Sequence, residues 1–180
     1  MDKSNRKKNT MKILIISLPR SGSTSLMFKI AEEKNLKPIS EPFDNRHKEP
    51  TKPYDDGYVI KTIVRQYPKT VTDPIEWYVN LSKEFDETIL LSRRDLKSCT
   101  ESLAYLNYFK MEGFQSNQDY FWKKTPNYEM SEFYINDCNN KINKLSEILN
   151  IPIIYYEDIF DVNSEKRLRK GNKQTPKELI

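Results

Sequence analysis

The strongest constraint on the fold is an apolar run that stops at a polar turn and then resumes with helical spacing. The run covers residues 13–18 and the turn residues 19–25, after which Leu26, Met27 and Ile30 fall on one helical face. This pattern predicts a buried strand, a tight turn and the start of a helix. The N-terminus of a helix carries partial positive charge and unpaired amide groups, so we expect the turn to bind an anion such as phosphate.

The turn combines a cation, a glycine and several hydroxyl groups. Its residues are Arg20, Ser21, Gly22, Ser23, Thr24 and Ser25. A nucleotide-binding P-loop requires Gly-x-x-x-x-Gly-Lys-Ser/Thr, but aligning the turn on Gly22 puts Ser17 at the first glycine and Ser23 at the lysine. A P-loop-like kinase therefore remains an alternative that the turn itself disfavours; it would also need an acidic Mg²⁺ ligand, for which Asp95 is the candidate.

The remaining chain alternates between short apolar strands and helical patterns. The expected strands lie near residues 12–17, 58–63, 88–92 and 151–156, and the expected helices near 23–34, from 73, after the third strand, and from 125 to 149. Asp73 and Asn150 are the expected capping residues. Near-continuous Ile/Leu/Val strands between helices predict a three-layer α/β/α fold with a mostly parallel central sheet. Residues 107–124 show no clear period and are interpreted as a lid or substrate loop.

A second constellation follows the third strand. Arg94, Ser98 and Ser102 are spaced by four residues, as on one face of a helix. A guanidinium with a hydroxyl two turns later suits a phosphate group. Arg93 is the competing candidate, but its eighth neighbour is Glu101, which would repel phosphate.

These two motifs resemble those of the sulfotransferase family, whose loop reads Lys/Arg-Ser-Gly-Ser/Thr-Thr and whose Arg and Ser, eight residues apart, hold a 3′-phosphate. Among the members of this family, the motifs most closely resemble those of the carbohydrate-type and bacterial sulfotransferases. The resemblance touches residues 13–26, 41–43, 58–62, 89–103, 153–159 and 169–171, in the family's order. It implies a P-loop-like sulfotransferase fold and the donor 3′-phosphoadenosine 5′-phosphosulfate, without a metal. It also implies that residues 20–25, Arg94 and Ser102 bind the donor, and that Arg169, Lys170 and Gly171 close over the 3′-phosphate.

The same resemblance suggests catalytic residues. Lys61 falls where cytosolic members carry Lys-Thr-His, and would contact the transferring sulfuryl group together with Arg20. The family's histidine is replaced by Ile63, so another base is required. Glu41, in a Glu-Pro pair similar to that of carbohydrate-type members, is the candidate base; the chain's one histidine, His47, is the fallback.

Composition limits the remaining possibilities. The net charge of +4 is concentrated at the ends: residues 1–12 carry five Lys/Arg against one Asp, and residues 165–180 carry six against two Glu. We expect a disordered basic segment at residues 1–11, then one domain at 12–180, in a cytoplasmic setting without a membrane span or a specific nucleic-acid partner. Two cysteines suggest neither a disulfide framework nor a metal site. The expected partner is a small-molecule or glycan acceptor; a non-catalytic nucleotide- or RNA-binding module is the remaining alternative.

Overall fold

A five-stranded, all-parallel sheet forms the centre of the protein. In the computed structural model, which describes residues 10–44, 57–113 and 127–160, the strand order is β2-β3-β1-β4-β5. The strands are β1 (Lys12–Ser17), β2 (Lys37–Ser40), β3 (Tyr58–Ile63), β4 (Glu87–Ser92) and β5 (Ile153–Tyr155). β1 pairs in parallel with both β3 and β4, so the first strand is also the central one.

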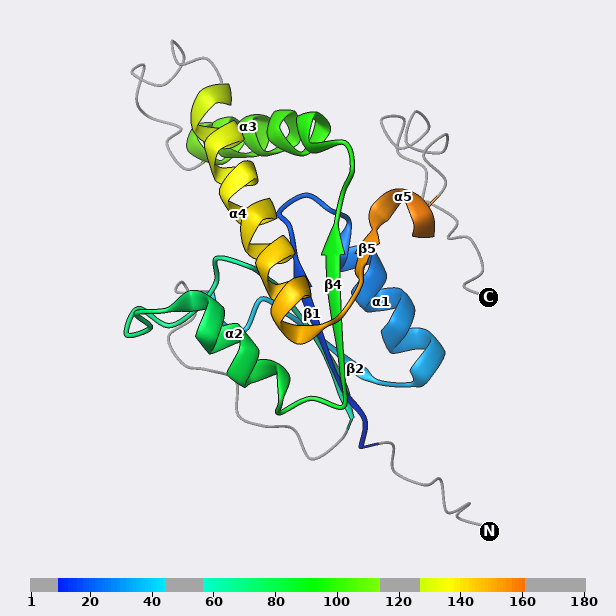
Figure 1. Cartoon of the computed structure of the whole chain (residues 1–180). Coiled ribbons are helices and arrows are strands. Elements are labelled where there is room, and N and C mark those ends of the chain that lie inside the picture. Colours follow the sequence, from blue (N-terminus) through cyan, green and yellow to red (C-terminus); the bar gives the residue numbers. More distant parts are fainter. Residues whose placement is uncertain (1–9, 45–56, 114–126, 161–180) are drawn as a thin grey trace.

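Helices cover both faces of this sheet (Figure 1). They are α1 (Ser23–Lys34), α2 (Pro74–Ser82), α3 (Leu96–Gly113), α4 (Tyr128–Leu149) and α5 (Tyr156–Ile159). Side chains of β1 alternate between two clusters: Ile13 and Ile15 pack with residues of α1 and α5, whereas Leu14 and Ile16 pack with residues of α2, α3 and α4. The α/β class with a parallel sheet between two helical layers is therefore confirmed.

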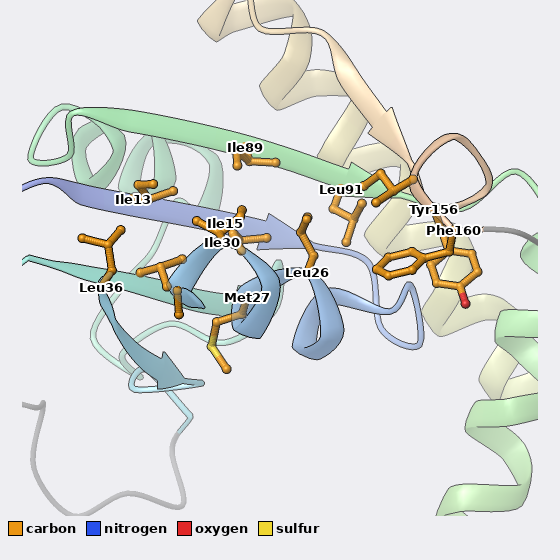
Figure 2. Packing of buried hydrophobic residues seen from close by; sticks show 13 residues of the cluster. Ile13, Ile15, Leu26, Met27, Ile30, Leu36, Ile89, Leu91, Tyr156 and Phe160 are labelled. Carbon is orange, nitrogen blue, oxygen red and sulfur yellow. The ribbon is translucent and has the colours of Figure 1, made fainter. Parts of the chain in front are cut away.

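The cluster on the α1 face extends to the end of the described chain. Leu26 and Met27 of α1 lie against Ile15, and the rings of Tyr156 and Phe160 lie beside the start of α1 (Figure 2). These two rings stack with centroids 4.8 Å apart. The short α5 therefore packs on the same side of the sheet as the turn that opens α1.

Local sequence signals match most element boundaries. Asp73 caps α2 by accepting hydrogen bonds from the amides of Ile75 and Glu76, with Pro74 at the first helical position. Asn150 ends α4 in the left-handed conformation at φ 53°. The predicted bounds of the first strand and first helix coincide with β1 and α1.

Two expectations about local structure were wrong. No strand was expected between the first helix and residues 58–63, but Lys37–Ser40 forms β2, a short edge strand with mostly exposed residues and a proline, which carries no alternating apolar signal. Residues 107–113, expected to belong to a lid or substrate loop, instead continue α3; residues 114–124 lie outside the described part. None of the described helices is both long enough and apolar enough to cross a membrane.

Candidate functional site

The two predicted phosphate motifs follow β1 and β4, which are neighbours in the sheet. The connection after β1 runs through α1 toward β2 and β3, whereas the connection after β4 runs through α3 and α4 toward β5 on the other side. The chain therefore leaves these strands in opposite directions and over opposite faces. In open parallel sheets this switch point, outside the carboxyl ends of the strands, is where ligands bind.

The turn between β1 and α1 leads into a helix whose first amides have no side-chain cap. Gly22 is the N-cap of α1 at φ 77°. A Cβ atom at Gly22 would overlap the ring of Tyr156, so both the conformation and the space require glycine. Ser21 is buried and its hydroxyl donates to the Leu18 carbonyl at 2.6 Å. The amides of the first turn, with the exposed Thr24 and Ser25, are therefore the groups that the loop offers to an anion.

Arg20 joins the two motifs. Its Nε donates to Ser102 Oγ of α3 at 2.8 Å, and its carbonyl oxygen lies 3.7 Å from the Cys99 thiol. The side chain is exposed, and in the described part of the chain it pairs with no carboxylate. α3 thus holds Arg20 at both its backbone and its side chain, while the outer guanidinium nitrogens can still bind an anion.

Lys61 lies beneath the start of α1. Its side chain is 5% exposed; Nζ donates to Thr24 Oγ1 at 3.2 Å and pairs closely with Glu41 Oε1. The Glu41 amide in turn donates to the Lys61 carbonyl at 2.7 Å. An ammonium at the positive end of a helix is unfavourable by itself, and the Glu41 carboxylate offsets this charge.

Glu41 is held as a carboxylate. Burial alone would raise its pKa, but hydrogen bonds from Lys61 and Gln66, together with the Lys61 charge, outweigh burial and lower the pKa below its ordinary value. Glu41 is therefore ionised at neutral pH. The ionised form is the one that can accept a proton.

Arg20 and Glu41 share an unusual backbone. Among the described residues, four other than glycine have positive φ. Asn35 and Asn150 are helix caps, a common use of asparagine in this conformation. The other two are Arg20 at φ 63° and Glu41 at φ 54°. Such strain costs about 1–3 kcal/mol per residue and is concentrated at functional sites.

Arg94 does not lie on α3, contrary to the expectation that it shares a helical face with Ser98 and Ser102. α3 begins at Leu96, and the Arg94 guanidinium turns toward α5, where it forms two hydrogen bonds with Asp158 at 2.6 and 2.8 Å. It also stacks over the Tyr155 ring at 4.4 Å. The structure therefore joins Ser102 to Arg20 and leaves Arg94 on Asp158.

The neighbouring Arg93 is buried against the same segment. Its Nε lies 3.6 Å from Glu157 Oε1, and its guanidinium lies 5.0 Å from the Tyr156 ring centroid. Glu157 also accepts hydrogen bonds from the Arg94 and Asp95 amides. Arg93 and Glu157 thereby fasten the end of β4 to the start of α5.

Several other candidates are structural or lie outside the described residues. Asp95, the Mg²⁺ ligand of the kinase alternative, accepts hydrogen bonds from the Ser98 amide and hydroxyl at the start of α3. His47 and the segment 169–171 belong to the part of the chain that the structure does not describe. Over residues 10–44, 57–113 and 127–160, no three His, Cys, Asp or Glu side chains gather as a metal site.

Two residues of the site were not expected from the sequence as ligands or partners. Gln66 contacts Glu41, and no local pattern marks it. Asp158 contacts Arg94; it lies within residues 153–159, for which no ligand or partner was predicted from the sequence. Comparison with protein-family models, with curated proteins and with solved structures gives no significant match to this chain.

Proposed function

We propose that the protein is a sulfotransferase that moves a sulfuryl group from 3′-phosphoadenosine 5′-phosphosulfate to a hydroxyl or amine acceptor. The observation that carries this proposal is the hydrogen bond from Arg20 to Ser102. It joins the loop that resembles the family's 5′-phosphosulfate loop to the helix that resembles its 3′-phosphate site. Lys61 contacts Thr24 at the start of α1, and Glu41 contacts Lys61, so both residues lie near the same loop.

Each residue has a defined task in the proposed reaction. The acceptor oxygen attacks sulfur in line, the bond from sulfur to the bridging phosphate oxygen breaks, and the acceptor proton moves to Glu41. Negative charge grows on the bridging oxygen and is stabilised by Arg20 and the amides at the start of α1. Arg20 stays protonated throughout, so it stabilises the leaving phosphate without donating a proton. Lys61 supplies positive charge beside the transferring group.

The pairing of Arg94 supports a second candidate, a nucleotide-binding module without catalysis. The Asp158 carboxylate binds the Arg94 guanidinium, the group that the resemblance assigns to the 3′-phosphate. A chain that binds only a 5′-phosphate through Arg20 and the loop would leave this pair intact. The two candidates differ in whether a 3′-phosphate on the ligand raises its affinity.

The first test is a calorimetric titration with adenosine 3′,5′-bisphosphate, beside 5′-AMP and ATP with Mg²⁺. The sulfotransferase proposal predicts tight binding of the bisphosphate and a large loss when its 3′-phosphate is absent. Equal affinity for the bisphosphate and 5′-AMP would favour the non-catalytic module, and preference for ATP with Mg²⁺ would favour the kinase.

Variants then separate binding from transfer. Arg20→Ala, Arg94→Ala and Ser102→Ala should each weaken binding of the bisphosphate, because each removes a charged or hydrogen-bonding group from the proposed phosphate site. Arg65→Ala is the matched control: it removes an arginine that pairs with Asp137 and stacks on Tyr134. Glu41→Gln should bind the bisphosphate normally and lose transfer from a labelled donor; transfer at the parent rate would make the assignment of the base wrong.

A further inference from the structure

Every polar atom of the Gln66 side chain has a partner. Nε2 donates to Glu41 Oε2 at 2.6 Å and to Asp44 Oδ2 at 2.9 Å, while Oε1 accepts from the Ile63 amide at 2.9 Å. This set fixes the orientation of the amide, because both N–H donors face carboxylates and the carbonyl oxygen faces a donor. Reversing the amide would place an oxygen against two negative charges.

The backbone of Gln66 is anchored as firmly as its side chain. Its amide donates to the Ile63 carbonyl at 2.7 Å. The hydroxyl of Tyr78, a fully buried residue of α2, lies 2.8 Å from the Ile63 carbonyl oxygen and 3.0 Å from that of Gln66. The turn after β3 is therefore held by a core side chain, and it presents Gln66 to the segment that follows β2.

The partners divide the Glu41 carboxylate between two donors. Lys61 binds Oε1 and Gln66 binds Oε2. Gln66 also stands between Glu41 and Asp44, the two acidic groups of this cluster. Because glutamine is neutral, it supplies hydrogen bonds to both without competing with Lys61 for Glu41. A carboxylate in its place would add a third negative charge, and an apolar residue would remove the donor that the two acids share.

We infer that Gln66 is a positioning residue that fixes the orientation and the ionised state of Glu41 and keeps Asp44 apart from it. Its catalytic consequence rests on the proposed function, since it assumes Glu41 as the base. Its electrostatic consequence does not, because the hydrogen bonds exist without a ligand.

The electrostatic test needs no substrate. Carboxyl carbon resonances of the ligand-free protein are titrated by NMR for the parent, Gln66→Glu and Gln66→Leu, with Glu41 assigned from Glu41→Gln. Gln66→Glu keeps the side-chain shape and the acceptor for Ile63, so the fold is expected to persist. We expect the pKa of Glu41 to rise by about one unit or more in both variants, since each loses a donor. Asn143→Ala, which changes an exposed amide on α4, is the control and should leave Glu41 unchanged.

The catalytic test uses the same variants. With a labelled sulfuryl donor, Gln66→Leu should lower kcat at least tenfold, leave the KM for the donor near that of the parent, and move the acidic limb of the pH–rate profile upward with the pKa of Glu41. Unchanged titration of Glu41 in both variants would overturn the inference. A raised pKa in a protein that shows no transfer would uphold the role of Gln66 and count against the proposed function instead.

Discussion

The Arg94 guanidinium and the Asp158 carboxylate form a two-point ion pair between the end of β4 and the short α5. A ligand phosphate on Arg94 has to displace this carboxylate. We therefore expect Asp158→Asn to bind adenosine 3′,5′-bisphosphate more tightly than the parent, with no gain for 5′-AMP. Both side chains are about half exposed, so water screens the pair and the gain should be a few fold. Calorimetric titration of both nucleotides measures it.

A charge-matched control separates this local effect from a general one. Glu33→Gln removes one negative charge from the opposite end of α1, where Glu33 pairs with Lys29. It should leave both affinities unchanged. A similar gain for 5′-AMP in Asp158→Asn would contradict a specific competition for the 3′-phosphate.

Gly22→Ala should destabilise the protein markedly. Left-handed strain contributes about 1–3 kcal/mol and overlap with the Tyr156 ring a similar amount, so we expect a loss of about 2–6 kcal/mol in the free energy of unfolding. Urea denaturation provides the measurement. Because the overlap involves one partner, adding Tyr156→Leu should cost less in the Gly22→Ala background than in the parent; strictly additive losses would argue against the contact.

The stability of the fold should depend on pH through Glu41. Its pKa is lower in the folded protein than the ordinary value of 4.5, because the Lys61 and Gln66 hydrogen bonds and the Lys61 charge outweigh burial. Ionised Glu41 therefore stabilises the fold above the unfolded pKa, and this contribution is lost as the pH falls through the folded pKa. Glu41→Gln lacks it at every pH, so its deficit relative to the parent should be largest near neutral pH and shrink on acidification. Urea denaturation at a series of pH values tests this; a deficit that grows at low pH would refute it.

Both cysteines should resist modification in the folded protein. Cys99 and Cys138 are fully buried, and burial raises the pKa of each thiol to about 12. Thiolate is the reactive form, so an aromatic disulfide reagent should label neither residue in buffer and both in urea. Rapid labelling of one thiol in buffer would show that the core around it opens.

The sequence carried enough local information for the sheet's centre and for most helix ends. β1, β3 and β4 are dense apolar runs buried on both faces, which is the signal of a parallel sheet. β2 lacked that signal because it is a short edge strand whose side chains are mostly exposed; backbone hydrogen bonds hold it to β3. The start of α3 was misplaced because Asp95, as its cap, sets the boundary after Arg94.

The candidate site likewise has residues that could be predicted from the sequence and contacts that could not. Arg20 and Gly22 lie in one turn whose residue types already indicate its geometry. Lys61 of β3 and Glu41 after β2 were predicted from the family resemblance. Their contacts with each other, and those of Gln66 and Asp158, join different elements. No spacing along the chain reports such contacts, so the direction of the Arg94 side chain could not be read from the motif that contains it.

The contact between Gly22 and Tyr156 also bears on the order in which the molecule is assembled. The turn after β1 leaves the ribosome before β5 and α5, yet the ring that packs against it belongs to α5. The packing around the turn is therefore complete only after β5 and α5 dock. Contacts between segments far apart in the chain form late when topology limits the folding rate. A ligand that requires the finished turn would therefore bind only to molecules in which β5 has joined the sheet.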